Sequence, residues 1–455
     1  MLVTVDGWAW MDKGSLTLTQ LQALKSSLTV RPRKVGDHPG DPPSPIKLYE
    51  EHDDRIGIAR QYFFQKSRGD ADVELRVSTG TKSLWPGPVL FAGDLRDEQE
   101  RGVATIVKAF YGGKLGGILR APCGFGKTVV ACAIASRLNV PTLVVVHKEF
   151  LMNQWRDRIV EFLPEAQIGR VQQDTCEFAG KHIVLAMVHS LASRDYGETF
   201  YNWPGLIIVD ETHRIGASTW APVPSKFPAK WRLGITATPR RKDGADNVFT
   251  YQIGKVVFAA KEEQLQARVR RVWSTFKLVK TPRFNPNLAP RSLLIRFLCS
   301  SEPRNRMIIE QMILALKADR TVLVLSERLN HLDTLNAMLF RMWGEDDGPV
   351  PGVGFYVGGM SENALSESSR MRCIFATKQM ASEGLDIPQL DTLVLATPMS
   401  DIEQARGRIL RPLYSDGRLG EKKTPIILDI RDDRVKKFQK LGESRDRQYR
   451  KLGDS

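Results

Sequence analysis

The chain has 455 residues, of which 42% are hydrophobic, 26% charged and 8% aromatic. This apolar content is sufficient for large cores and excludes disorder over most of the length. No stretch approaches the ~18 consecutive apolar residues of a membrane span, so we expect no membrane partner. Lys and Arg total 66 against 52 Asp and Glu, and the net charge of +14 favours a polyanionic partner.

The five cysteines indicate a reducing compartment. Their number is odd and none forms a C-x-x-C pair, which favours buried free thiols over a disulfide framework or a zinc or iron–sulfur site. The seven histidines are scattered, so we expect any metal to arrive with a substrate. The first ten residues carry Asp6 and lack the basic-then-apolar pattern of a signal peptide, which predicts a cytoplasmic protein.

Residues 1–90 predict a small accessory domain with short strands. Trp8 and Trp10 alternate within an apolar stretch, as on one face of a strand. Residues 31–47 hold five prolines and two glycines, which is typical of a loop or extended connector. Core packing is the favoured role of the two tryptophans, and stacking on nucleic-acid bases is the alternative.

From residue 91 onward, short apolar runs alternate with helical patterns. This alternation predicts an α/β fold with parallel sheets covered on both faces. The first strands are expected at 118–121, 142–146, 183–187, 206–209 and 233–236, with helices such as 127–138 and 148–162 between them. The pattern then restarts, with strands expected at 321–325, 353–357, 372–376, 392–396 and 425–430. We therefore predict two successive α/β units, over residues 91–275 and 276–455, after the accessory domain.

The segment that bridges the two units is strongly basic. Residues 265–320 contain 12 Lys or Arg and 3 Asp or Glu, a balance of +9 within the total of +14. One interpretation is the solvated face of a linker. The other is a surface that follows the phosphates of a nucleic acid.

The stretch Ala-Pro-Cys-Gly-Phe-Gly-Lys-Thr follows an expected strand and opens an expected helix. Its glycines, Gly124 and Gly126, let the backbone turn N–H groups toward phosphate oxygens at a helix N-terminus. Lys127 can reach the β- and γ-phosphates of a nucleotide, and the Thr128 hydroxyl can ligate Mg²⁺. The first position of the stretch, Ala121, departs from the usual glycine of a phosphate loop.

A second block, Asp210 and Glu211, ends a buried apolar strand. Packing alone does not explain two adjacent carboxylates at such a position. Asp210 can hold Mg²⁺ through water, and Glu211 can act as the general base for an attacking water. Together with the phosphate loop, this pair predicts nucleotide hydrolysis.

A third block lies on a helix expected in the second α/β unit and contains Gln404, Arg408 and Arg411. The two arginines share one face of that helix and suit the charge that spreads over a transferring γ-phosphoryl group. If they serve the nucleotide bound by Lys127, hydrolysis would open and close a cleft between the units, as in a motor. The alternative is an exposed basic helix.

These three blocks, in this order, resemble superfamily 2 helicases and translocases. Further stretches between residues 91 and 430, such as LRDEQ, VVVH, ITATP and ASEGLDIP, resemble other motifs of that family. The resemblance implies two tandem RecA-like domains, ATP with Mg²⁺ as cofactor, and a nucleic-acid track across both domains.

The same resemblance implies roles for individual residues. Those implied to contact the nucleotide, besides the blocks above, are Arg96, Gln99, Gly384 and Asp386. Those implied to contact nucleic acid are His147, Gln154, His189, Ser190, Ser326, Arg328, Thr377 and Ser382. Those implied to couple hydrolysis to movement are His213, Thr236 and Thr238.

The finer resemblance is to DNA motors. The acidic box reads Asp-Glu-Thr-His rather than Asp-Glu-Ala-Asp, which argues against the main RNA-helicase group. The stretches VLVLSER, MASEGLDIP and SDIEQARGRILRP are similar to phage-encoded, UvsW-type branch-migration helicases and, more distantly, to XPB and RecG. This implies an enzyme in the host cytoplasm that acts on single-stranded and branched DNA in recombination, repair or replication. It also implies that residues 1–90 are an accessory DNA-binding domain.

Other functions stay open at this point. An RNA helicase would be stimulated by RNA rather than DNA. A double-stranded DNA translocase without strand separation would respond equally to blunt duplex. An inactive nucleic-acid-binding scaffold would have no need of the intact residues of the ATP site. A non-motor ATPase or kinase would have no need of the second α/β unit.

Overall fold

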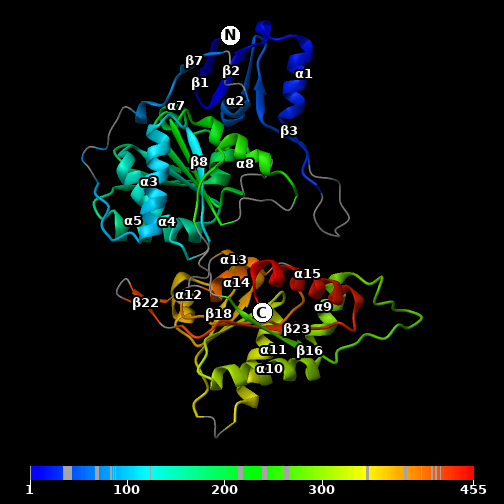
Figure 1. Cartoon of the computed structure of the whole chain (residues 1–455). Helices are drawn as coiled ribbons and strands as arrows, with labels where there is room; N and C mark the ends of the chain where they lie inside the picture. The colour runs from blue at the N-terminus through cyan, green and yellow to red at the C-terminus, as the bar shows by residue number, and fades with distance from the viewer. Residues whose placement is uncertain are drawn as a thin grey trace. The chain divides into compact units, whose positions relative to one another are not determined.

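The computed structural model describes residues 2–33, 44–66, 71–81, 85, 87, 89–122, 124–213, 219–237, 243–260, 266–344, 348–383, 387–400, 402–410, 413–415, 418–420 and 422–454. The chain forms two compact units, residues 1–262 and residues 263–455, and each is built around a largely parallel β-sheet (Figure 1). No helix among the residues given above is long and apolar enough to cross a membrane.

Unit 1 begins with a separate five-stranded sheet, in the order β5-β6-β2-β1-β7. β7 pairs with β1 in parallel, and the other neighbours are antiparallel. The elements of this region are β1 (Leu2–Val5), β2 (Trp8–Asp12), α1 (Leu18–Ser27), β3 (Thr29–Val30), β4 (Ile46–Lys47), β5 (Tyr49–Glu51), β6 (Arg55–Ala59), α2 (Arg60–Lys66) and β7 (Asp72–Leu75).

The two tryptophans of β2 have different surroundings. Trp8 is buried in the core of the N-terminal sheet, as predicted. Trp10 is half-buried and lies flat on Gly57 of β6, where a Cβ atom would come within 2.8 Å of the indole. Its Nε1–H donates to Asp6 at 3.0 Å, and the Arg55 guanidinium stacks over its ring at 4.5 Å. Trp10 is therefore fixed on a sheet face rather than packed in the core.

Two buried arginines join the N-terminal sheet to the rest of unit 1. Arg60, at the start of α2, donates to the backbone carbonyl oxygens of Ala229 at 2.7 Å and Leu115 at 3.0 Å. Arg232, in the main sheet, donates in the opposite direction to the carbonyl oxygen of Gly7 at 2.8 Å. Because the bonds run both ways, the N-terminal sheet is an integral part of unit 1, and the predicted division at residue 90 falls inside this unit.

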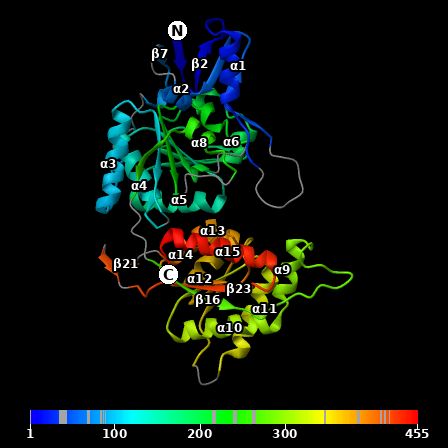
Figure 2. The ribbon, with the colours of Figure 1, turned by 45° about the vertical axis from the view of Figure 1, so that its right-hand side comes forward.

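The main sheet of unit 1 has eight strands in the order β11-β10-β12-β9-β13-β14-β8-β15, parallel except for β10 with β11. Its strands are β8 (Gly116–Arg120), β9 (Thr142–Val146), β10 (Ile168–Gln172), β11 (Thr175–Cys176), β12 (Ile183–Met187), β13 (Leu206–Asp210), β14 (Trp231–Thr236) and β15 (Val256–Ala259). Its helices are α3 (Asp97–Tyr111), α4 (Lys127–Leu138), α5 (Glu149–Phe162), α6 (Val188–Ser193), α7 (Glu198–Tyr201) and α8 (Asp246–Gln252). α3, α4 and α5 pack on one face, and α6, α7 and α8 pack on the other. Figure 2 shows α3 and α4 on one side of the sheet and α6 and α8 on the other.

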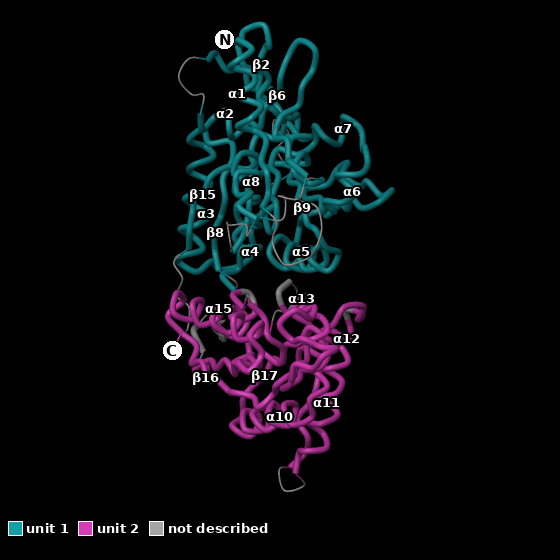
Figure 3. Tube along the Cα trace, turned by 90° about the vertical axis from the view of Figure 1, so that its right-hand side faces the viewer, with its two compact units in different colours: residues 1–262 teal, residues 263–455 magenta. Residues whose placement is uncertain are grey.

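Unit 2 is the magenta part of Figure 3. Its sheet has six parallel strands in the order β16-β23-β20-β17-β19-β18. The strands of unit 2 are β16 (Arg268–Trp273), β17 (Val322–Ser326), β18 (Val353–Tyr356), β19 (Cys373–Thr377), β20 (Thr392–Leu395), β23 (Ile426–Arg431) and the hairpin of β21 (Leu413–Ser415) with β22 (Arg418–Gly420). Its helices are α9 (Arg291–Cys299), α10 (Glu302–Lys317), α11 (Leu329–Met342), α12 (Glu362–Ser369), α13 (Lys378–Glu383), α14 (Glu403–Ile409) and α15 (Lys436–Leu452). α10 and α11 cover one face, and α13, α14 and α15 cover the other.

The predicted fold class is confirmed: two parallel α/β units follow a small region with its own sheet. All ten expected strands form, and their ends differ from the expected ones by no more than two residues. The sequence did not indicate β10, β15 and β16. Strand β16 belongs to the sheet of unit 2, although the predicted division at residue 275 assigned it to the first α/β unit.

Candidate functional site

The predicted phosphate loop connects β8 to α4. Gly124 and Gly126 have φ angles of 83° and 84°, a left-handed conformation that favours glycine. α4 begins at Lys127 without a side-chain cap, so its first turn presents backbone N–H groups suited to an anion. The Lys127 Nζ donates to the carbonyl oxygen of Ala121 at 3.1 Å, and Thr128 lies half-buried in the same turn.

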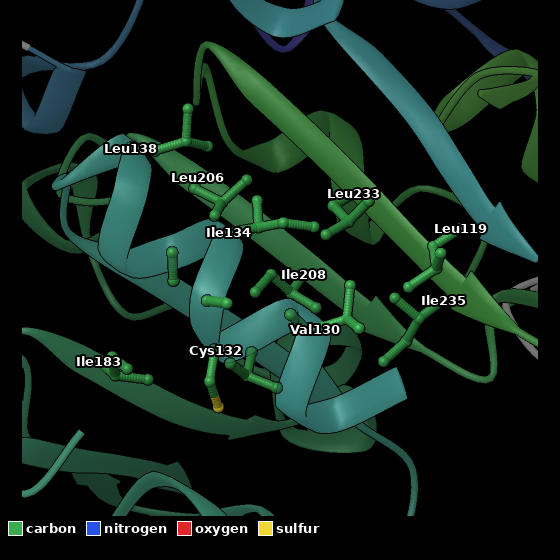
Figure 4. Packing of buried hydrophobic residues seen from close by; sticks show 14 of the residues in the cluster. Leu119, Val130, Cys132, Ile134, Leu138, Ile183, Leu206, Ile208, Leu233 and Ile235 are labelled. Atoms are coloured by element: carbon green, nitrogen blue, oxygen red, sulfur yellow. The ribbon is translucent and has the colours of Figure 1, made fainter. Parts of the chain in front are cut away.

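A buried face holds α4 against the sheet beneath this loop. Val130 and Ile134 of α4 face Ile208 of β13 and Leu233 of β14, and Leu138 lies beside Leu206 (Figure 4). This apolar contact fixes the N-terminal end of α4 at the end of β8, where the glycines turn the chain.

Two residues at the start of α3 hold the phosphate loop from another side. The Gln99 Nε2 donates to the carbonyl oxygen of Phe125 at 2.7 Å, and the Arg96 guanidinium donates to the same oxygen. The Gln99 Oε1 in turn accepts the N–H of Arg96 at 2.9 Å. A Cβ on Gly126 would come within 2.6 Å of the Gln99 Nε2. These two residues, predicted to contact the nucleotide, thus position the backbone of the loop.

Asp210 ends β13 and is held by two donors. The Trp155 indole of α5 donates to its Oδ2 at 2.9 Å, and the backbone N–H of Glu211 donates to its Oδ1 at 2.8 Å. Burial first, and the negative charge of Glu211 second, raise the pKa of Asp210 to about 6. The positive charge of Lys127 acts against this shift, which places the loop and the acidic pair in one electrostatic neighbourhood.

His213 links the acidic pair to the next strand. Its Nδ1 lies 3.3 Å from the Oε2 of Glu211 and 3.0 Å from the Oγ1 of Thr236 at the end of β14. Thr212 between them is fully buried, and its hydroxyl donates to a backbone carbonyl oxygen at 3.0 Å. The structure therefore brings two predicted coupling residues, His213 and Thr236, together with the candidate general base.

The candidate nucleic-acid residues of unit 1 differ in exposure. Gln154 on α5 and His189 on α6 are exposed, and the His189 ring packs against Trp220 with centroids 4.8 Å apart. His147 follows β9 and is buried. Ser190 is buried too, and its hydroxyl accepts a backbone N–H at 2.9 Å.

In unit 2 the corresponding candidates lie at the ends of strands and in helices. Ser326 ends β17 and is fully buried, where its Oγ accepts the N–H of Arg328 at 3.1 Å and lies 3.0 Å from the Nδ1 of His331. Arg328 itself is exposed at the start of α11. Thr377 ends β19 half-buried, and Ser382 lies in α13. Ser326 thus positions the backbone of Arg328, and contact of these residues with nucleic acid stays a prediction.

The third predicted block forms a helix, α14, as expected, and Gln404 lies on it. Arg408 is buried, and its Nε donates to the carbonyl oxygen of Ala381 in α13 at 2.9 Å. Arg406, two residues before Arg408, has a structural role because it is bound by the buried carboxylate of Asp454 at 2.8 Å. Four predicted site residues lie outside the described residues: Thr238, Gly384, Asp386 and Arg411.

The donors at the end of β13 fit a divalent cation bound with a nucleotide. Asp210 and Glu211 are adjacent carboxylates whose repulsion raises a pKa, and a cation would relieve that repulsion. The Thr128 hydroxyl adds an oxygen of the kind that Mg²⁺ prefers. Among the residues that the structure describes, no group of three or more His, Cys, Asp or Glu side chains could hold a metal ion.

Sequence reasoning missed the role of Trp155 at this site. The residue lies on the buried face of α5, with Leu151 and Ile159, so its helical spacing indicated only a core residue. The available signal was chemical: a buried indole N–H needs an acceptor, and the nearest buried strand end carries a carboxylate.

Comparisons with known proteins agree with this geometry. The profile of the family described as "Type III restriction enzyme, res subunit" matches residues 92–241. The "Putative ATP-dependent RNA helicase L396" of Acanthamoeba polyphaga mimivirus is 33% identical over 454 residues, covering 97% of this chain and 83% of that protein. The chain belongs to the superfamily 2 helicases. It is therefore an enzyme of the ATP-dependent helicase type.

This helicase also resembles proteins that are named for other activities. The "DNA 3'-5' translocase XPB2" of Sulfurisphaera tokodaii is 30% identical over 224 residues, covering 49% of this chain and 47% of that protein. Among solved structures, a fragment of a putative HsdR subunit of a type I restriction enzyme from Vibrio vulnificus matches with a TM-score of 0.54 and 19% identity, over 77% of this chain and 66% of that one. T4 UvsW matches with a TM-score of 0.40 and 14% identity, over 99% and 97%. The HsdR match supports the helicase fold alone.

Proposed function

We propose that this helicase uses ATP hydrolysis to remodel branched DNA, such as forks, displacement loops and four-way junctions, in recombination, repair or replication. The ATP half rests on one observation: Lys127 of the phosphate loop and the Asp210–Glu211 pair share one electrostatic neighbourhood. The DNA half is supported by the similarity to the translocase XPB2 and by the Asp-Glu-Thr-His form of the acidic box.

Different residues of unit 1 bind ATP, hold Mg²⁺ and activate the attacking water. Lys127 and the α4 N-terminus bind the phosphates, and Thr128 with Asp210 holds Mg²⁺, which supplies charge neutralisation. Glu211 accepts the proton of the attacking water. His213 contacts both Glu211 and Thr236, so a change in the charge of the acidic pair alters its hydrogen bond with Thr236 at the end of β14.

The remaining predicted residues complete the proposal. Gln404, Arg408 and Arg411 serve the transferring phosphoryl group. Gly384 and Asp386 belong to the nucleotide site. The strand-end and helix residues of both units bind phosphates of the DNA, so binding is independent of sequence and weakens with salt.

The substrate class is tested by ATP hydrolysis at one moderate salt concentration. Parallel reactions contain single-stranded DNA, blunt duplex DNA, a four-way DNA junction or RNA of matched length. We expect the strongest stimulation from the junction. Equal stimulation by blunt duplex would identify a translocase without strand separation and would contradict the branched-DNA proposal.

The ATP site is tested by Lys127→Ala. Without the amine, the phosphates lose a charged contact, and we expect ATP turnover to fall by about a hundredfold or more. DNA binding, measured by fluorescence anisotropy, should stay within about twofold. Lys114→Ala, at an exposed lysine of the same unit, is the control and should keep wild-type turnover. Wild-type turnover in Lys127→Ala would show that the site is assigned wrongly.

The second candidate is an RNA helicase. It is favoured by the similarity to the mimivirus protein, which is named as a putative RNA helicase and matches 97% of this chain. The same panel decides: stimulation by RNA alone would replace the DNA proposal and leave the ATP site unchanged.

A further inference from the structure

A loop between β16 and α9 projects from unit 2 beside α9 (Figure 1). We call residues 277–288 the basic arm. Its cations, Lys277, Lys280 and Arg283, are exposed and have no ion-pair partner among the residues that the structure describes. The surrounding stretch, residues 266–300, contains eight Lys or Arg and no Asp or Glu. Two of these eight, Arg271 and Arg291, are paired with Asp446 and Glu327 from other parts of unit 2, whereas the three cations of the basic arm have no such pair within the described part of the chain.

The N-terminal end of the basic arm is packed against the rest of unit 2. Phe276, just before the arm, packs in a small core with Leu294 of α9 and Phe438 of α15. Within the arm, the N–H of Thr281 donates to the carbonyl oxygen of Phe284 at 2.8 Å, and the reverse bond is 3.1 Å long. These contacts fix the arm on α9 and α15, while its three cations stay exposed.

Exposed apolar side chains alternate with cations along this part of the chain. Val279 and Leu288 of the basic arm are 67% and 81% exposed. Trp273 at the end of β16 is 61% exposed, and Phe297 on α9 is 42% exposed. Cations interleaved with exposed apolar and aromatic groups suit a nucleic acid, because phosphates bind the cations and bases stack on the rings.

A groove of about 1030 Å³ lies between the C-terminal end of α9 and α11. Arg296 of α9 and Arg328 line it, and the Arg328 guanidinium donates to a carbonyl oxygen of α9 at 3.4 Å. Two acidic residues, Glu302 and Glu327, also line it, but Glu327 is already bound by Arg291 at 2.7 Å. Cations therefore run from the basic arm along α9 to Arg328, a candidate nucleic-acid residue.

We propose that the basic arm, α9 and this groove form one nucleic-acid-binding strip, which holds the part of a branched substrate that lies beyond the strand on the predicted motif residues. The inference rests on the proposed function and names the surface that distinguishes a branched substrate from a single strand. The strip contacts phosphates and bases without reading sequence.

The test compares binding of a labelled single strand with binding of a fork built on the same strand, by fluorescence anisotropy of the full chain at three salt concentrations. For K277E/K280E/R283E we expect fork affinity to fall about tenfold or more, with single-strand affinity within about twofold. The slope of log affinity against log salt on the fork should become shallower by about 2 to 3, since each phosphate contact contributes ~0.9. Arg296→Glu, inside the groove, should give the same selective loss at about three- to fivefold.

The control is K436E/K440E/R447E on exposed positions of α15, which makes the same change of net charge. It should leave fork binding within about twofold. The proposal is overturned by an equal loss in the control, by equal losses on fork and single strand in the arm variant, or by wild-type fork binding in Arg296→Glu.

Matched single-stranded and forked RNAs separate this inference from the proposed function. If the wild-type enzyme binds and responds to RNA only, the branched-DNA function fails. The strip is then judged on the forked RNA: a selective loss in the arm variant supports it, and an equal loss on both RNAs overturns it.

Discussion

Both units bury arginines, but they hold them with different partners. In unit 1, Arg60 and Arg232 donate to main-chain carbonyl oxygens. In unit 2 most of the partners are aspartates, as in the fully buried pair of Arg304 and Asp432, whose two hydrogen bonds are 2.7 and 2.9 Å long. Arg408 of unit 2 differs, because it donates to the main-chain carbonyl oxygen of Ala381. The same residue type thus joins chain segments in one unit and neutralises charge in the other.

The type of partner determines which part of the structure must be in place before each arginine is satisfied. The carbonyl oxygens that Arg60 binds belong to the main sheet region, so its hydrogen bonds form only when the N-terminal sheet is packed against that region. Burial lowers the pKa of Arg60 to about 9, and the nearby charge of Asp6 opposes that shift, so the guanidinium is charged at neutral pH. An aspartate can be removed alone, which leaves an arginine buried without its counter-charge.

The largest effect is therefore expected in unit 2. Asp432→Ala leaves the charge of Arg304 buried and should destabilise unit 2 by about 3–5 kcal/mol. Urea unfolding of the full chain, read peptide by peptide with pulsed hydrogen exchange, should show earlier unfolding of β17 and β23. The double variant R304M/D432A should recover much of the loss. A double variant as unstable as the single one would contradict the charge explanation.

A smaller effect is expected from Arg60→Met in unit 1. The variant removes the donor of the Ala229 carbonyl oxygen and one of the two donors of the Leu115 carbonyl oxygen, which still accepts the N–H of Arg232 at 3.1 Å. A buried carbonyl oxygen left without a donor costs about 1–3 kcal/mol. Pulsed exchange should report earlier unfolding in β1 and β2 and also in β14. An effect confined to residues 1–66 would contradict the proposed role of Arg60, because it would show that unfolding of the N-terminal sheet is not coupled to the main sheet.

Acidification should weaken unit 2. Burial first, and the charge of Arg304 second, lower the pKa of His331 from 6.5 to about 3. Between these values the unfolded chain binds a proton that the folded unit does not, so unit 2 loses stability as pH falls below 6.5, by about 2 kcal/mol at pH 5. The measurement is urea unfolding at pH 7, 6 and 5 with exchange pulses at one fixed pH. His331→Gln should flatten the dependence.

Unit 1 should show the opposite slope from Asp210. Its pKa is raised from 3.8 to about 6, so the folded unit takes up a proton first as pH falls. The cost of burying this charge is fully present above pH 6 and is relieved toward pH 3.8, by about 1.4 kcal/mol at pH 5. Asp210→Asn should remove this contribution in the same experiment. Parallel pH slopes in the two units would show that other groups dominate.

The smallest effect is expected at α1, which buries none of its residues. Thr17 and Gln20 form a capping box there, with hydrogen bonds of 3.2 and 2.9 Å. Thr17→Ala should cost about 1 kcal/mol and raise exchange in α1 alone. Faster exchange in β14 as well would extend the coupling beyond the two arginines.

The sequence was sufficient to predict the fold and the site where the hydrophobic pattern and the functional side chains lie in the same short segment. The apolar run ending at Asp210 predicted both a strand and a carboxylate at its end, and Gly126 predicted the left-handed turn before α4. It was insufficient for β16, where arginines alternate with valines on an edge strand and mask the apolar run. It also could not show Arg60 or Arg232, because a main-chain carbonyl oxygen carries no residue identity.

The docking of the N-terminal sheet has a consequence for the order of synthesis. Arg60 leaves the ribosome 169 residues before Ala229, whose carbonyl oxygen it binds. At about 5–20 residues per second, the nascent sheet waits roughly 10–30 s for that acceptor. Over this interval its guanidinium stays hydrated and its docking face stays open, so this interval is when we expect the growing chain to depend most on chaperones.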